Sequence, residues 1–283
     1  MTLNRSLLFI LCICVFSCNI EPYEEDVTSE EIEEVDETEE EEEETTDYVL
    51  LKQLVYNKGT VDEYTETFNY DGNKLTSVDY GDGYKNVYTY DSNDKLIKDE
   101  WFADNELEAS VDLEYNSDGE IASYIENFYK SSGLDERQYK NIFIHNSDGT
   151  ITKEVYLSID GSDFEIRWTE TITFEGLNIL EIANDDDFKQ SYTYDDKNNA
   201  FKNIHAIEIL NFLTENEFGT IIYGNTNNII SRVDSDTSTT DSFLDNYRYE
   251  YTYNENNYPI SCTYTSEYSD GNIDVETIEY FYE

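Results

Sequence analysis

The sequence predicts an all-β fold: an antiparallel β-hairpin repeat meander that forms a single twisted or rolled sheet, together with one short amphipathic helix. First, aromatic and polar residues alternate after residue 47, and a period of two is typical of half-buried antiparallel strands. Second, clusters of Asn, Asp and Gly end many of these segments, as hairpin turns require. Third, Pro259 is the only proline after residue 47, which suits strands that need their backbone N–H groups.

Residues 1–17 have the pattern of a lipoprotein signal peptide. Arg5 supplies a positive start, and the apolar run from Leu7 to Phe16 is too short to span a bilayer as a helix. The run ends in Val15-Phe16-Ser17-Cys18, which resembles the bacterial lipobox. That resemblance implies cleavage before Cys18 and attachment of lipid to Cys18. The alternative is a secreted protein in which this cysteine is incidental.

Residues 18–47 form an acidic segment that we expect to be a disordered linker. Between Glu21 and Asp47 there are 17 acidic residues and no Lys or Arg. Such a block has too little apolar surface to fold, and its charges repel one another. Two roles stay open for it: a solvated tether, or an acidic export signal beside a lipid-bearing Cys18.

Residues 48–283 form the predicted β-repeat domain. A degenerate unit recurs in which two aromatic residues flank a polar one and a turn follows, as in Tyr88-Thr89-Tyr90-Asp91. Recurrence at intervals of about 20 to 30 residues indicates a repeat architecture. The second aromatic position of each unit is called the anchor below, and the anchors are Tyr70, Tyr90, Tyr115, His145, Phe174, Tyr194, Tyr223, Tyr253 and Tyr282.

The repeat resembles the YD-repeat (RHS-like) family over roughly residues 64–283. The resemblance rests on Phe68-Asn69-Tyr70-Asp71, Tyr88-Thr89-Tyr90-Asp91 and Tyr192-Thr193-Tyr194-Asp195. It implies a long antiparallel meander coiled into a roll, as in uncharacterised bacterial lipoproteins built from similar repeats. The chain is too short for the cargo-enclosing shells of that family. The usual Gly-Arg-Leu after the turn is also replaced, for example by Asn73-Lys74-Leu75.

One stretch, Asn203 to Glu217, departs from the strand pattern. Apolar side chains at Ile204, Ile207, Leu210 and Leu213 have helical spacing, and Asn203 is a candidate N-cap. We therefore expect a short amphipathic helix that covers part of the aromatic face of the sheet.

Catalysis has little support in the sequence, and no catalytic residue is predicted. His145 occupies an anchor position and His205 lies on the expected helix, so both are predicted to be structural. Cys262 is the only cysteine after residue 47 and is expected to fill space in a strand. The acidic excess of the domain, 48 acidic residues against 16 Lys and Arg, argues against a nucleic-acid partner.

Calcium is the one metal worth weighing. Asp91-Ser92-Asn93-Asp94 and Asp195-Asp196 offer hard oxygen ligands, but their spacing matches no calcium-loop motif. Hairpin turns use the same residue types. We therefore expect these residues to be turns and predict no cofactor and no metal site.

Trp101 and Trp168 are the candidates for stacking against a ligand, since tryptophan combines a large apolar face with a polar tip. The anchors are expected to be core instead. The function expected first is a non-enzymatic, lipid-anchored cell-envelope protein at the outer membrane, which presents its β-repeat domain to a protein partner or matrix. The alternative is a glycan-binding surface lipoprotein of a polysaccharide-uptake system. In both cases the membrane is reached through the lipid on Cys18.

Overall fold

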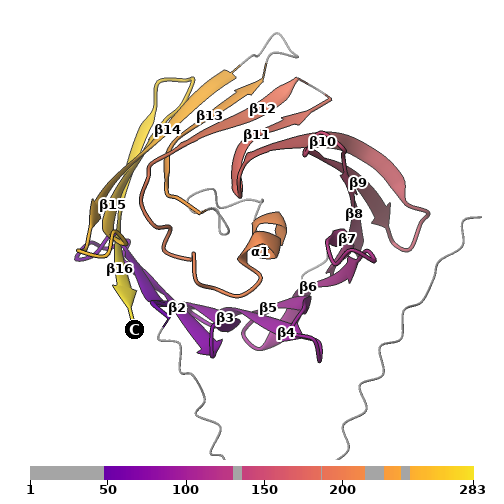
Figure 1. Ribbon diagram of the computed structural model, residues 1–283, viewed down its shortest axis with the longest axis horizontal. Helices are drawn as coiled ribbons and strands as arrows, with labels where there is room; N and C mark the ends of the chain where they lie inside the picture. Colours follow the sequence, from indigo (N-terminus) through magenta and orange to yellow (C-terminus); the bar gives the residue numbers. More distant parts are fainter. Residues whose placement is uncertain (1–47, 130–135, 186, 214–225, 237–242) are drawn as a thin grey trace, which may run out of the picture. The chain divides into compact units, whose positions relative to one another are not determined.

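The domain is a closed antiparallel β-barrel of 16 strands with its chain-order neighbours paired throughout (Figure 1). The computed structural model describes residues 48–129, 136–185, 187–213, 226–236 and 243–283. These residues belong to a compact unit that spans Thr46–Glu283. The predicted signal peptide and linker, and the anchor Tyr223, lie outside the described residues.

The elements follow one another around the barrel in chain order. The helix is α1 (Ile207–Leu213), and the strands are β1 (Leu51–Tyr56), β2 (Tyr64–Asp71), β3 (Lys74–Gly81), β4 (Tyr84–Tyr90), β5 (Leu96–Ala103), β6 (Glu106–Tyr115), β7 (Ile121–Phe128), β8 (Arg137–His145), β9 (Ile151–Ile159), β10 (Glu165–Glu175), β11 (Asn178–Asn184), β12 (Phe188–Tyr194), β13 (Ile229–Asp236), β14 (Phe243–Tyr253), β15 (Pro259–Glu267) and β16 (Ile273–Tyr282).

The prediction of an antiparallel meander is confirmed, but the prediction of a single twisted or rolled sheet is wrong. The last strand, β16, pairs with the first, β1, through partners that include Tyr56 with Ile278 and Leu54 with Tyr280. Closure satisfies the backbone groups that an open sheet would leave at two edges. Local alternation is identical in an open and in a closed meander, which is why the sequence pattern did not distinguish them.

The repeat owes its turn residues to one hairpin geometry. After the anchors Tyr90, Tyr115, His145 and Tyr253, the N–H of the fourth loop residue donates to the carbonyl of the first. That fourth residue has a positive φ in each case: 61° at Asp94, 88° at Gly119, 87° at Gly149 and 61° at Asn257. Gly, Asn and Asp adopt this conformation most readily, so the turn selects them.

The anchors are held by their polar tips as well as by packing. In five of them the tyrosine hydroxyl donates a hydrogen bond to a backbone carbonyl near the start of another strand. Tyr90 donates to Leu75 of β3 (3.1 Å), and Tyr70 donates to Leu51 of β1 (2.7 Å). His145 fills the same role through Nε2 and the carbonyl of Ile121 at 2.8 Å. The structural role predicted for His145 is thus confirmed.

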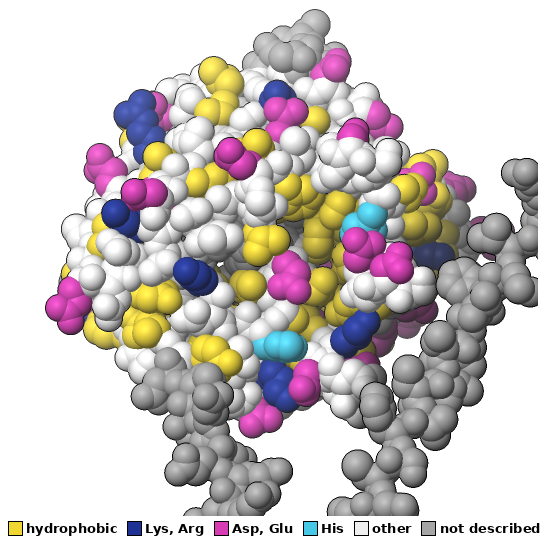
Figure 2. Space-filling model, in the orientation of Figure 1, with side chains coloured by type: hydrophobic (Ala, Val, Ile, Leu, Met, Phe, Trp, Pro, Cys, Tyr) yellow, Lys and Arg dark blue, Asp and Glu magenta, His cyan; other side chains and the backbone are white. Residues whose placement is uncertain are grey.

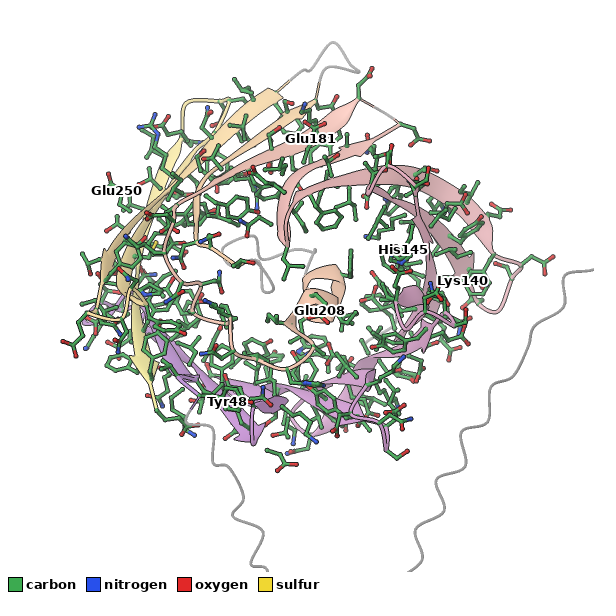
Figure 3. The ribbon with its side chains drawn as sticks, in the orientation of Figure 1. Tyr48, Lys140, His145, Glu181, Glu208 and Glu250 are labelled. Atoms are coloured by element: carbon green, nitrogen blue, oxygen red, sulfur yellow. The ribbon has the colours of Figure 1, made fainter. Side chains whose placement is uncertain are left out.

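Side chains of one parity face the barrel interior and those of the other parity face outward. The inward set supplies the core, including Phe68, Leu75, Tyr88, Leu96 and Ile172. The outward set mixes hydroxyl-bearing and charged residues with apolar ones such as Leu244, Val275 and Phe281, and Figure 3 shows Glu250 of β14 on the outside. Neighbouring outward residues bond to one another, as Thr193 does to Ser231 and Thr252 to Ser261.

A segment between β12 and β13, residues 195–213, fills one end of the interior and is called the plug below. A 16-stranded barrel is too wide for wall side chains alone to fill, since barrels of about 16–18 strands leave a channel. Figure 1 shows α1 within the ring of strands. Leu210 is fully buried there, and Phe212 packs on Phe143 with ring centroids 4.9 Å apart.

The expected helix is therefore present and covers the aromatic face, but it is shorter than predicted. Asn203 does not cap it; its side-chain amide donates to the carbonyl of Val49 and to the hydroxyl of Tyr258. The helix begins at Ile207, after Ala206 adopts a positive φ of 58°. Residues 214–217 of the predicted span lie outside the described residues. Within the described ranges, no helix has both the length and the hydropathy to cross a membrane.

Candidate ligand-binding site

The two ends of the barrel differ in chemistry. The plug is bonded to the turns at one end: the backbone N–H of His205 donates to the carbonyl of Asn73, and that of Asn198 to the carbonyl of Asn257. The opposite end, where the hairpins after Gly81 and Ala103 lie, is called the mouth. Four inward-facing aromatic side chains near the mouth are solvent-exposed: Tyr64 (42%), Tyr84 (45%), Trp101 (37%) and Phe128 (38%).

Trp101 stands at the centre of the best-defined cluster. Its ring stacks on Tyr84 of the neighbouring strand, with centroids 5.9 Å apart and planes 17° from parallel. Asn86 lies directly opposite Trp101 in the β4–β5 ladder. The Asn86 amide donates to Asp99 Oδ1 at 2.8 Å, and Asp99 lies two residues from Trp101 on the same face. An exposed aromatic pair thus adjoins an amide and a carboxyl group.

Burial sets the charge state of this carboxyl group. The protein around Asp99 raises its pKa from 3.8 to about 7, and the nearby carboxylates Glu126 and Glu100 add to the rise. The Asn86 hydrogen bond acts in the opposite direction because it favours the ionised form. Burial also raises the pKa of Glu66 on β2 to about 7. Near neutral pH these two groups can therefore donate or accept a hydrogen bond.

The wall formed by β9 to β14 is different, because its inward acids are paired with cations. Lys153 and Glu170 form an ion pair at 3.2 Å, and Arg232 and Asp234 form another at 2.7 Å. The guanidinium of Arg232 also lies over the ring of Tyr247, 4.1 Å from its centroid. These groups stabilise one another and already have partners for their charges.

The structure separates the two tryptophans predicted to stack on a ligand. Trp101 is exposed at the mouth, as that role requires. Trp168 lies on β10, five strands further around the barrel, is partly buried, and donates its Nε1–H to Glu170 Oε1 at 2.9 Å. The two do not form one platform.

The remaining candidates are part of the scaffold. The Nε2 of His205, which lies before α1, is bonded to the carbonyl of Asp94 at 2.7 Å. Cys262 is buried in β15 as expected, and burial raises the pKa of its thiol to about 12. Cys18 lies outside the described residues.

The loops weighed for calcium act as turns. Asp91 accepts hydrogen bonds from the N–H groups of Asn93 and Lys95, and Asp94 pairs with Lys74. Asp195 accepts bonds from Lys197 and Asn228. Among the residues that the structure describes, no group of three or more His, Cys, Asp or Glu side chains is arranged to hold a metal ion.

Sequence reasoning missed the neighbours of Trp101. Tyr84 shares the parity of Tyr88 in the alternating pattern, but nothing local shows that this end of the aromatic face is exposed. Asp99 and Glu66 were two among many carboxylates. Their distinguishing signal is an acidic residue at an inward parity position, where the alternation predicts an apolar residue.

Comparisons with known proteins support the fold. No family model matches the chain, and no curated protein matches it. A porin-like protein from Bacteroides vulgatus is similar in structure, with 13% sequence identity, a TM-score of 0.53, and coverage of 83% of this chain and 99% of that one. A porin-like protein from Bacteroides uniformis has 14% identity, a TM-score of 0.39 and coverage of 82% and 98%.

The closed barrel corrects the resemblance inferred from the repeat. The chain does not form a YD-repeat (RHS-like) roll, and the porin-like structure from Bacteroides vulgatus is similar to it in fold. The aromatic-turn unit arises because each hairpin at the plug end needs a left-handed loop residue and an aromatic anchor. Similar local needs in an unrelated β-meander produce a similar short motif.

The interior of this barrel differs from that of a typical transmembrane barrel. Transmembrane barrels carry an outward apolar band and a polar interior. Here exposed outward positions include Thr89, Thr193, Glu250 and Thr252 and also the apolar Ile144, Leu244, Ile273, Val275 and Phe281, while the interior holds the core. Figure 2 shows acidic and apolar side chains together on the end of the barrel in view. The outward face of the described strands mixes polar and apolar side chains.

Proposed function

We propose that this protein is a non-enzymatic, lipid-anchored component of the cell envelope that binds a carbohydrate at the mouth of its barrel. The exposed Trp101–Tyr84 pair beside Asn86 and Asp99 carries the proposal. A sugar ring has an apolar C–H face and a polar hydroxyl edge. An aromatic face covers the first, while amide and carboxyl groups bond to the second.

This ranking reverses the one suggested by the sequence. Presentation of the sheet to a protein or matrix was expected first because the aromatic residues were assigned to the core. Trp101 and Tyr84 are instead exposed, and they face the interior of the barrel rather than its outer wall. A slender ligand can reach into the mouth and contact these rings, whereas a flat protein surface cannot. The placement therefore favours a slender ligand.

Substitution of Trp101 tests the carbohydrate site. Purified full-length protein is screened on a glycan array, and the binding constant of a positive glycan is measured by calorimetry. Trp101→Ala should weaken binding about tenfold or more, equivalent to about 1.4 kcal/mol. The matched control is Phe281→Ala, because Phe281 is 40% exposed but lies on the outer face. Equal binding by Trp101→Ala and wild type would contradict the proposal.

The anchoring part of the proposal rests on Val15-Phe16-Ser17-Cys18. Lipid on Cys18 would attach the protein to a membrane. Mass spectrometry of membrane fractions should find lipid-modified Cys18, and Cys18→Ala should move the protein to the soluble fraction. Protease treatment of intact cells then distinguishes a surface position from a periplasmic one.

A further inference from the structure

The exposed aromatic cluster around Trp101 is one of three that recur along the mouth. Inward aromatic pairs join β1 to β2, β4 to β5, and β7 to β8, and each contains a mouth residue that is 37% to 45% exposed. The pairs are Tyr56 with Tyr64 (4.2 Å, planes 6° apart), Tyr84 with Trp101 (5.9 Å) and Phe128 with Tyr139 (6.0 Å, 84°).

These pairs are evenly spaced around the wall. Each pair lies three strands from the next in the barrel order. Adjacent strands are about 4.8 Å apart, so successive pairs lie about 14 Å apart measured across the strands. The mouth of this half of the barrel thus repeats the same aromatic feature at a regular interval.

On each of three strands, a carboxyl group lies two residues further from the mouth than the exposed ring, on the same inward face. Glu66 is two residues from Tyr64, Asp99 is two residues from Trp101, and Glu126 is two residues from Phe128. Asp99 and Glu126 are close enough for their charges to interact. Each of the three clusters therefore offers an aromatic face beside a hydrogen-bonding group, and together they are called the mouth arc.

The opposite wall also carries an inward aromatic pair beside an acid, Phe188 with Phe243 (6.2 Å) and Asp245 two residues from Phe243, but both rings are only partly exposed. There the inward acids Glu170 and Asp234 are engaged by Lys153 and Arg232. The indole N–H of Trp168 is likewise committed to Glu170. Among the inward aromatic pairs of the described residues, those with a solvent-exposed ring lie on the arc from β1 to β8, which gives the mouth one binding side.

A regular row of equivalent contacts matches a ligand that presents the same chemical group at regular intervals. We propose that the mouth arc binds an extended oligosaccharide chain along its length, with the three clusters as successive subsites. This inference rests on the carbohydrate binding proposed above. Subsites joined on one rigid wall act together, so affinity should rise steeply with ligand length even when each subsite binds weakly.

The experiment measures affinity against chain length. Malto-, cello- and chito-oligosaccharides from monosaccharide to octasaccharide are titrated into purified full-length protein by calorimetry. In the series that binds, the octasaccharide should bind at least about tenfold more tightly than the monosaccharide, a difference of about 1.4 kcal/mol.

Single-subsite variants locate the chain on the wall. Tyr64→Ala and Phe128→Ala lie on either side of Trp101, and each should weaken octasaccharide binding about threefold to tenfold. The same variants should leave binding of the shortest ligand that occupies the Trp101 cluster unchanged. Trp101→Phe and Phe281→Ala serve as the conservative and outer-face controls, and thermal melting confirms that each variant is folded.

Two results would overturn this inference, and they differ from one another. Equal affinity for monosaccharide and octasaccharide, with loss only in Trp101→Ala, would leave a carbohydrate site but remove the extended one. Failure of every oligosaccharide series to bind would reject both the extended site and the carbohydrate proposal on which it rests.

Discussion

The anchor hydroxyls should contribute measurably to stability, and Tyr70 offers the cleanest test. Its hydroxyl donates to the carbonyl of Leu51 at 2.7 Å, beside the β1–β16 seam that closes the barrel. Leu51 has no solvent exposure. Tyr70→Phe keeps the ring against the core and removes only the donor, so its effect reports the hydrogen bond.

The expected magnitude follows from what is left behind. A typical intramolecular hydrogen bond contributes about 1 kcal/mol net, whereas a buried acceptor left without its partner costs about 1–3 kcal/mol. Because Leu51 is buried, Tyr70→Phe should lower the free energy of unfolding by about 1–3 kcal/mol. The anchors Tyr115 and Tyr194 make the same kind of bond, to Leu96 and Ile179, on well-separated strands. Distant sites add, so the triple Phe variant should lose about the sum of the single losses.

The assay is urea denaturation of the domain followed by circular dichroism. Tyr84→Phe is the matched control, because Tyr84 is 45% exposed and should change stability by less than about 0.5 kcal/mol. Indistinguishable midpoints for Tyr70→Phe and Tyr84→Phe would show that the anchor hydroxyls contribute nothing. The repeat would then owe its aromatics to ring packing alone.

Three further predictions concern charge. Burial raises the pKa values of Asp99 and Glu66 to about 7, so the folded state binds extra protons between about pH 4 and pH 7, and stability should fall across that window as pH rises. Asp99→Asn should reduce this loss of stability by up to about 1.4 kcal/mol for each unit of pKa shift. Urea denaturation midpoints measured at several pH values test this, and an unchanged dependence on pH would contradict the prediction. Asp234→Asn removes the carboxylate that pairs with the buried Arg232 and should cost about 3–5 kcal/mol in the same assay, whereas loss of the exposed Lys58–Glu279 pair should cost less than about 1 kcal/mol. NaCl should raise the melting temperature by screening the acidic excess, and a larger rise with CaCl₂ at equal ionic strength would restore the calcium site that the turn bonds argue against.

The local features of this fold were predictable because they depend on short-range chemistry. Alternation identified the strands, Asx and Gly residues identified the turns, and the anchor position of His145 indicated its structural role. The helix was found from its apolar spacing but not its limits. Asn203 is drawn into bonds with Val49 and Tyr258, which are distant in sequence. Tertiary partners override a local capping preference.

Closure and the mouth arc were not predictable, since both depend on long-range geometry. Whether β16 reaches β1 depends on strand number and stagger, which no single hairpin specifies. Likewise, Tyr88 and Tyr84 occupy equivalent positions in the pattern, yet Tyr88 is 6% exposed and Tyr84 is 45% exposed. Among the described residues the plug bonds to the turns at one end, so the same inward face is core near the plug and accessible near the mouth.

The two faces of the barrel wall together limit what this fold can do. Because side chains alternate, the inward tyrosines of β14 from Tyr247 to Tyr253 leave Arg248, Glu250 and Thr252 outside. A transmembrane barrel has a polar interior and an apolar band toward lipid. The wall protects an aromatic interior from water, the plug is bonded into one end, and the remaining inward aromatics become available only at the mouth. Any ligand that uses them must arrive from solvent at that end, which is why the exposed rings of Tyr64, Trp101 and Phe128, rather than the outer surface, define the site.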